Sequence, residues 1–217
     1  MPDPHSPSIA SPPEAERPDP ALGPEELRER GLKECLGSEQ GVLEFGFGRA
    51  EALIELARAA PDRWFLGIEV SRKRVEKAAR RVAKSGVRNL RLMHAPAEYV
   101  LERVLPEGCV TECWINFSDP WPKKRHHKRR LIRLEVVREL VRVLAPGARL
   151  HMATDHAGYA DWIREVMARV PGFRNLNAPA PWSDRRPARL ETRYEAEFRA
   201  EGRWIAYFEY QKGSGSP

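Results

Sequence analysis

Short apolar segments typical of strands alternate with longer segments of helical periodicity along most of the chain. Strands are expected at residues 42–45, 64–70, 89–94, 109–117 and 148–154. Helices are expected between and after them, at residues 50–60, 72–85, 97–105, 128–144 and 156–170. Because parallel strands need crossover helices, this alternation predicts an α/β fold with a mostly parallel sheet and helices on both faces. Two last strands, at 173–177 and 204–211, are expected to form an antiparallel C-terminal pair.

The folded domain is expected to span residues 25–212. Residues 1–24 are acidic and rich in proline, and residues 213–217 read GSGSP, so both segments are predicted to be disordered tails. No apolar run approaches the roughly 20 residues that a membrane-spanning helix needs, and no secretory signal is expected. Three cysteines without disulfide spacing favour reduced thiols and a cytoplasmic location.

Positive charge is concentrated in the domain. The chain has a formal net charge of +6, but residues 1–26 hold six acids and one base, so the remainder carries +11. Such a basic domain indicates a polyanionic partner. The densest group, here called the basic cluster, is KKRHHKRR at residues 123–130. Cations at the start of the expected helix 128–144 oppose its dipole, which also points to an external anion.

Distinctive polar residues stand where the expected strands end, and ligands of such sheets bind beyond the carboxyl ends of the strands. Glu44, Gly46 and Gly48 stand at the end of the first strand, and Glu69 ends the second. This glycine turn lacks the third glycine of the dinucleotide fingerprint, and its neighbouring acids disfavour a pyrophosphate. The pattern therefore favours S-adenosylmethionine, which carries cationic amino and sulfonium groups, over NAD.

The fourth strand leads into the turn DPWP, in which Asp119 stands directly before the basic cluster. A carboxylate can accept hydrogen bonds from two neighbouring donors on the Watson–Crick edge of guanine, whereas adenine offers only its amino group there. Asp119 therefore predicts guanine as the target base. Trp121 fits two interpretations, stacking on a base or packing on the sheet. Asp155 follows the fifth strand, where it either binds substrate or caps the next helix.

Five motifs occur in order and together cover about residues 41–212: LEFGFGRAE, GIEV, INFSDPWPKKRHHKRRL, ATDHAGYADW and TRYE. In sequence and separation they resemble the TrmB-type tRNA (guanine-N7)-methyltransferase family. The resemblance implies a Rossmann-like class I methyltransferase fold with S-adenosylmethionine as the methyl donor. It also implies methylation of the variable-loop guanosine of tRNA, at position 46 of tRNA numbering.

The resemblance also implies roles for individual residues. The cofactor is expected at Glu44, Gly46, Gly48, Glu69 and Asp119, and Asp119 is also the expected catalytic residue. The substrate nucleotide is expected at Lys123, Asp155, Thr192, Arg193, Tyr194 and Glu195. The RNA is expected at Arg125, His126, His127, Lys128, Arg129 and Arg130. One position departs from the family, because Pro96 stands in the cofactor site where an acid near the adenine is usual; Glu98 is a candidate replacement.

Other functions also fit the sequence. The protein could methylate another RNA or a small molecule, or it could bind RNA without catalysis. A nucleotide dehydrogenase is disfavoured by the missing third glycine. No metal is expected, because the two histidines of the basic cluster have no second group at metal-ligand spacing. Both a monomer and a homodimer are compatible with the sequence.

Overall fold

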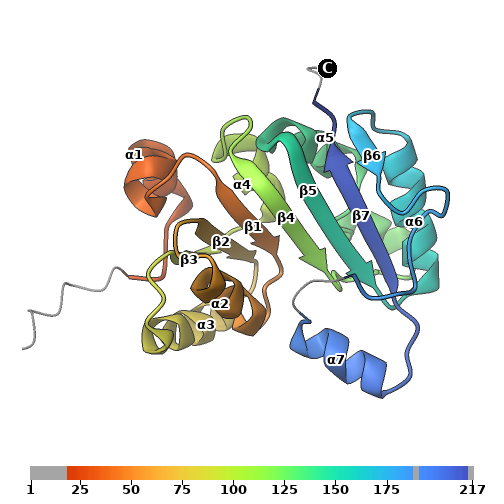
Figure 1. Ribbon diagram of the computed structural model, residues 1–217, viewed down its shortest axis with the longest axis horizontal. Helices are drawn as coiled ribbons and strands as arrows, with labels where there is room; N and C mark the ends of the chain where they lie inside the picture. The colour runs from red at the N-terminus through yellow and green to blue at the C-terminus, as the bar shows by residue number, and fades with distance from the viewer. Residues whose placement is uncertain (1–18, 188–190, 215–217) are drawn as a thin grey trace, which may run out of the picture.

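The computed structural model describes residues 19–187 and 191–214 and forms a seven-stranded sheet (Figure 1). The strands are β1 Gly41–Phe45, β2 Trp64–Glu69, β3 Leu90–His94, β4 Val110–Asn116, β5 Leu144–Thr154, β6 Phe173–Asn175 and β7 Ala206–Lys212. Their order across the sheet is β3-β2-β1-β4-β5-β7-β6. β1 to β5 run parallel, whereas β7 is antiparallel to both β5 and β6. The predicted fold class is confirmed.

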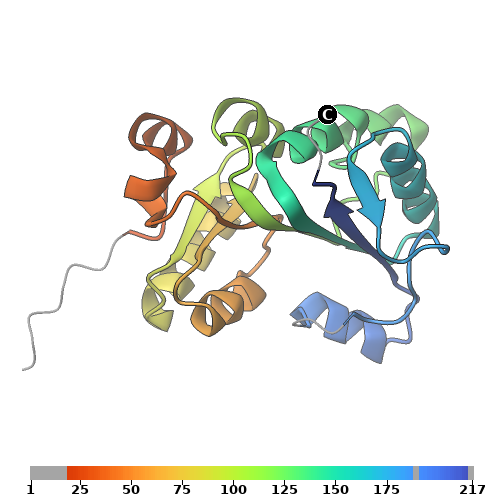
Figure 2. The same cartoon turned by 45° about the horizontal axis from the view of Figure 1, so that its top comes forward.

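Helices cover both faces of this sheet (Figures 1 and 2). They are α1 Pro24–Leu36, α2 Glu51–Ala59, α3 Arg72–Ser85, α4 Ala97–Arg103, α5 Leu134–Val143, α6 Ala157–Ala168 and α7 Arg193–Ala200. Alternate residues of a strand face opposite sides. Val42 accordingly packs with α2 and α3, and Leu43 packs with α1, α4, α5 and α6. Among the described residues no helix has the length and apolar character to cross a membrane.

The segment between β4 and β5 differs from the predicted helix 128–144. The 3₁₀-helix η1 spans Lys124–Arg129, and α5 begins only at Leu134. Arg133 between them is extended, with φ −146° and ψ 166°. The basic cluster therefore precedes α5 by several residues. The expected opposition between its cations and the helix dipole is wrong, because that field acts only within the first turn.

Residues 20–22, before the predicted domain boundary, are part of the fold. Leu22 donates a backbone hydrogen bond to Leu92 at 2.9 Å, and Leu92 donates one to Pro20 at 2.7 Å. The side chain of Leu22 is buried in the core. Residues 20–22 thus cover the outer edge of β3. The prediction that the disordered tail extends to residue 24 is therefore wrong for these last residues. Residues 1–18 and 215–217 of the predicted tails lie outside the described residues.

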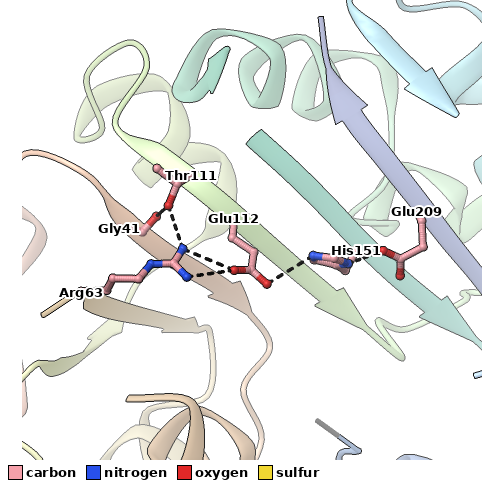
Figure 3. Close-up of polar contacts among 6 residues, drawn as sticks. All are labelled: Gly41, Arg63, Thr111, Glu112, His151 and Glu209. Carbon is pink, nitrogen blue, oxygen red and sulfur yellow. Dashed lines mark hydrogen bonds and ion pairs between the residues drawn. The ribbon is translucent and has the colours of Figure 1, made fainter. Parts of the chain in front are cut away.

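A polar network crosses β4, β5 and β7 on one face of the sheet (Figure 3). His151 lies between two carboxylates, with Nδ1 2.5 Å from Glu209 and Nε2 3.3 Å from Glu112. Arg63 completes the network with an ion pair to Glu112 at 3.3 Å. Burial by itself lowers the pKa of His151, but the hydrogen bonds and charges of both carboxylates outweigh burial and raise it. Burial conversely raises the pKa of Glu112, but His151 and Arg63 outweigh it and lower this pKa.

These opposite shifts predict a stability maximum in weakly acidic solution. The raised pKa of His151 stabilises the fold below its ordinary value of 6.5, and this contribution is lost as the pH rises through the folded-state pKa. The lowered pKa of Glu112 stabilises above 4.5 and is lost as the pH falls through its folded-state pKa. In urea unfolding, His151→Gln should therefore lower the free energy of unfolding more at about pH 6 than at about pH 9. An equal loss of unfolding free energy at both pH values would contradict a charged His151.

Candidate active site

Two cavities open side by side at the carboxyl ends of the parallel strands. The α7 cavity, of about 190 Å³, lies between the loop after β1 and α7. The β2 cavity, of about 280 Å³, lies between the ends of β2, β3 and β4. Gly46, Asn116 and Phe117 line both cavities, so the two adjoin. Polar residues at the strand ends predicted a site at this edge of the sheet.

The glycine turn after β1 opens the backbone to a ligand. Gly46 and Gly48 have φ values of 75° and 55°, in the left-handed region that glycine adopts without steric cost. A Cβ atom at Gly46 would meet no atom within 4 Å, whereas one at Gly48 would lie 3.5 Å from the ring of Tyr194. The turn thus leaves space at Gly46 and approaches α7 at Gly48.

Two buried carboxylates stand at this edge, as predicted. Glu44 lines the α7 cavity and Glu69 lines the β2 cavity, and they are 7% and 4% exposed. Glu69 accepts a hydrogen bond from the backbone of Ser71 at 3.0 Å and pairs with Arg74 at 3.3 Å. A carboxylate has about four acceptor positions. Glu69 therefore keeps acceptor capacity for further donors such as hydroxyl groups.

The DPWP turn presents Asp119 on a strained backbone. Phe117 and Trp121 on either side of it have φ values of 52° and 41°. A left-handed conformation costs a non-glycine residue about 1–3 kcal/mol and is concentrated at functional sites. Asp119 is exposed, lines the β2 cavity and has no hydrogen bond or ion pair to any other residue that the structure describes. Its carboxylate is therefore available to a ligand.

Arg130 holds this turn in place. Its Nε donates to the carbonyl oxygen of Pro120 at 2.8 Å, and its Nη2 lies 3.5 Å from that of Trp121. The guanidinium also lies over the rings of Tyr159 and Trp162, at 5.3 and 4.8 Å from their centroids. Arg130 is only 3% exposed. In this structure Arg130 therefore serves the packing of the turn, and its contact with RNA stays a prediction.

The remainder of the basic cluster lies at the surface. The exposed cations are Lys123, Lys124, Arg125, Lys128 and Arg129. Two ring contacts anchor η1, because His126 packs against Trp121 at 5.7 Å and His127 against Trp162 at 5.4 Å. Arg129 covers the Trp121 ring at 5.1 Å, and both residues line the β2 cavity. Trp121 therefore packs on the basic cluster rather than on the sheet.

Thr192 and Glu195 form the start of α7, a helix that is not among those expected from the sequence. The Thr192 hydroxyl accepts from the backbone of Glu195 at 3.2 Å, and the Glu195 carboxylate accepts from the backbone of Thr192 at 3.2 Å. This reciprocal pair is a capping box, and the spacing T-x-x-E was the sequence signal for it. Glu195 is fully buried, whereas Thr192, Arg193 and Tyr194 line the α7 cavity.

Asp155 lies outside both cavities, in an ion pair with Arg203 at 2.9 Å. It does not cap the following helix. His156 caps α6 instead, because its Nδ1 accepts from the backbone of Tyr159 at 3.2 Å. The interpretation of Asp155 as a helix cap is therefore wrong. Its position as a substrate contact stays a prediction.

The unusual Pro96 stands directly before α4, beside the β2 cavity. Its neighbours Ala95 and Ala97 line that cavity, as does Glu98. The Glu98 carboxylate forms an ion pair with Arg133 at 2.8 Å. The structure thus places Glu98 close to the expected cofactor region, but its carboxylate is already paired with Arg133.

Asn116 is a site residue that sequence reasoning missed. It ends β4 and lines both cavities. The nitrogen and the oxygen of its side chain are both buried and make no hydrogen bond to any described residue. Such a buried amide costs about 1–3 kcal/mol of stability, and a role in binding a ligand is one explanation for keeping it. A polar residue ending the strand before the DPWP turn was the available signal.

Solved structures share this fold at low sequence identity. An rRNA methylase from Streptococcus thermophilus has a TM-score of 0.54 and 14% identity, with 81% of this chain and 89% of that chain covered. The 16S rRNA methyltransferase KamB has a TM-score of 0.59 and 20% identity, with 87% and 92% covered. The fold is that of the class I methyltransferases.

Sequence comparison identifies the family. A family model described as "Putative methyltransferase" matches residues 38–207. The tRNA (guanine-N(7)-)-methyltransferase of Nitrosococcus oceani is 43% identical over 164 residues, which cover 76% of this chain and 68% of that protein. The enzyme of the same name from Pseudomonas putida W619 is 40% identical over 170 residues, covering 77% and 71%. The chain belongs to the tRNA (guanine-N7)-methyltransferase family, as its motifs predicted.

Replacing Arg130 with Met should destabilise the protein by about 1.5–3 kcal/mol, because the hydrogen bonds of a charged donor are lost while an apolar stem remains. The matched control is Arg129→Met, one residue earlier on the surface. We expect that substitution to change the free energy of unfolding by no more than about 0.5 kcal/mol. Chemical denaturation measures both values. Equal losses would contradict a turn-holding role that belongs to Arg130 alone.

Replacing Asn116 with Leu should leave the free energy of unfolding unchanged or raise it by up to about 1–3 kcal/mol, because an unpaired buried amide is removed. Binding of the methyl donor or the substrate should weaken. The control is Asn89→Leu, since the Asn89 amide donates to the carbonyl oxygens of Ala57, Ala60 and Arg63 at 2.8–2.9 Å. That variant should lose stability in urea unfolding. A similar loss for Asn116→Leu would show a structural role instead.

Proposed function

We propose that this protein transfers a methyl group from S-adenosylmethionine to N7 of the variable-loop guanosine of tRNA, at position 46 of tRNA numbering. The observation that carries the proposal is the meeting of two features at one cavity. Asp119, a carboxylate suited to guanine, and Arg129, an exposed member of the basic cluster, both line the β2 cavity. The names of the related enzymes support tRNA as the substrate.

The residues at the two cavities fit S-adenosylmethionine. When bound, this cofactor supplies a methyl group made electrophilic by a sulfonium. Glu44 and Glu69 offer buried acceptors for its amino and ribose hydroxyl groups, and the open backbone at Gly46 admits close approach. The Asn116 amide offers both a donor and an acceptor. Pro96 departs from the family pattern, and its flanking alanines give the adenine an apolar wall instead.

Asp119 selects the base. Its two carboxylate oxygens accept from the ring N–H and the exocyclic amino group of guanine, which are neighbours on one edge. The negative charge of the carboxylate also stabilises the positive charge that develops on the ring as N7 is methylated. The strained residues Phe117 and Trp121, together with Arg130, hold this carboxylate at the mouth of the β2 cavity.

The chain contributes positioning rather than proton transfer. N7 of guanine has an in-plane lone pair and no hydrogen, so its reaction needs no general base. The rate enhancement then comes mainly from alignment of the reacting atoms. Lys123, Asp155 and the segment Thr192–Tyr194 hold the nucleotide, with the capping box to Glu195 fixing that segment at the α7 cavity.

The exposed cations of the basic cluster hold the RNA backbone. Lys123, Lys124, Arg125, Lys128 and Arg129 have no ion pair to any residue in the described part of the chain, so phosphates do not have to displace a protein carboxylate. Arg130 belongs to the turn and not to this surface. We place the reaction in the cytoplasm, where three buried free cysteines are stable as thiols.

The test is methylation of unmodified tRNA by the purified protein, followed by nucleoside mass spectrometry and mapping of the modified position. We expect 7-methylguanosine in the variable loop and no methylated adenosine. A tRNA in which that guanosine is replaced by adenosine is the control and should stay unmethylated. Product in another RNA only, or at adenosine only, would refute the proposal.

The variant Asp119→Asn separates charge from shape at the base-selecting position. Asparagine has the same size but replaces one acceptor with an NH₂ group that opposes the guanine donors. A hydrogen bond to a charged group contributes about 1.5–3 kcal/mol, so single-turnover methylation should slow by about 10- to 150-fold. Calorimetric titration with S-adenosylmethionine should show a smaller loss. A wild-type rate would mean that Asp119 only shapes the turn.

A further inference from the structure

Helix α3 carries more positive charge than its folding accounts for. It contains one acid, Glu76, and seven cations, which are Arg72, Lys73, Arg74, Lys77, Arg80, Arg81 and Lys84. Like charges four residues apart destabilise a helix, and Lys77 has such a neighbour on both sides, at positions 73 and 81. Three cations in the first turn also oppose the helix dipole. These positions therefore point to an anion outside the protein.

One side of α3 forms the wall of a basic groove. The groove is lined by Arg49, Arg74, Lys77, Arg81 and the ring of Tyr194, together with Gly48 and Ala78. Positions 74, 77 and 81 follow the helical repeat, so they project from the same side. Val75, Ala78 and Val82 form the adjoining buried side, which fixes the orientation of the helix, and Ala78 lies at the floor of the groove. The wall of the groove is therefore formed by a helix that is anchored in the core.

The groove continues into the proposed active site. It shares Gly48, Arg49 and Tyr194 with the α7 cavity, and it shares Arg74 with the β2 cavity. Tyr194 is 50% exposed at this junction. A polyanion bound in the groove would thus pass directly into the cavities where the target base is held.

Protein carboxylates neutralise only part of this charge. Arg74 pairs with Glu69 at 3.3 Å, and Arg81 approaches Glu51 at 3.8 Å. Lys77 has no hydrogen bond or ion pair within the described ranges of the chain. It is exposed in the centre of the groove wall, and it is the residue most available to a phosphate.

The basic cluster and the α3 groove lie on different sides of the sheet. The cluster packs on α6 through the contact of His127 with Trp162. α6 belongs to the layer of α1, α4, α5 and α6. α3 belongs to the opposite layer with α2. Both surfaces reach the carboxyl edge of the sheet, with the two cavities between them. A nucleotide held there has a phosphate on each side, and each flank of its backbone then meets a basic surface.

We propose that the α3 groove binds the phosphate backbone of the RNA substrate on one flank of the target nucleotide, while the exposed basic cluster binds the other flank. This inference extends the proposed function, because it takes the RNA substrate of that function as the partner. The groove contributes affinity and orientation and takes no part in methyl transfer.

The central test is the charge reversal Lys77→Glu. Glutamate at position 77 converts two repulsive spacings, with Lys73 and Arg81, into attractive ones, so the variant should be at least as thermostable as the wild type. Its tRNA affinity should nevertheless fall several-fold, and the log–log salt slope should decrease by about 0.7–0.9 for one lost phosphate contact. KM for tRNA should rise with little change in kcat, because Lys77 lies outside the machinery of transfer.

Two matched variants control for charge alone. Lys77→Arg keeps the cation and should bind tRNA as the wild type does. Lys33→Glu makes the same charge reversal on an exposed residue of α1, outside the groove, and should leave the salt slope unchanged. Equal affinities and slopes for Lys77→Glu and Lys33→Glu would overturn the proposal.

Site-specific cross-linking tests the contact directly. The native cysteines Cys35, Cys109 and Cys113 are buried, so a thiol-directed photo-crosslinker should react mainly at an introduced surface cysteine. Lys77→Cys should cross-link to tRNA, and Lys33→Cys should not. Absence of a cross-link from Lys77→Cys would also overturn the proposal. Because binding and cross-linking need no methyl transfer, a wild-type protein that makes no 7-methylguanosine would refute the proposed function separately.

Discussion

The chain changes its direction of winding between β1 and β4, and this reversal decides where the two cavities of the candidate site lie. From β1 the sheet grows to β2 and β3 on one side, and then β4 and β5 extend it on the other. The loops that leave β1 and β4 therefore diverge and open a crevice at a topological switch point. Gly46 from the first loop, and Asn116 and Phe117 at the end of β4, line both cavities there.

The site in this crevice is built at a cost to the stability of the fold. Phe117 and Trp121 adopt left-handed backbone conformations, and the amide of Asn116 is buried without a hydrogen bond to any described residue. Arg130 offsets part of this cost, because its buried guanidinium binds the carbonyl of Pro120 and packs on two aromatic rings. Stability elsewhere in the sheet, including the His151 network, allows such local strain to persist.

Positive charge serves two separate purposes in this protein. Inside, Arg130 fixes the turn that carries Asp119. Outside, the cluster on η1 and the face of α3 leave cations such as Arg129 and Lys77 without ion pairs among the described residues. The two surfaces lie on opposite layers of the same sheet, and the cavities lie between them. The cations are thereby divided between holding the turn that carries Asp119 and forming the surfaces proposed to bind a polyanion.

The sequence alone determined the alternating α/β fold and the edge that carries the site, because hydrophobic periodicity and polar strand ends are local properties of the chain. It also held the capping box of α7 in the spacing of Thr192 and Glu195. Tertiary structure alone decided that Arg130 is buried while Arg129 beside it is exposed, since the two differ only in which aromatic rings and carbonyls the fold brings near. It likewise decided that α3 and the loop after β1 meet as one groove, because that contact joins residues far apart in the chain.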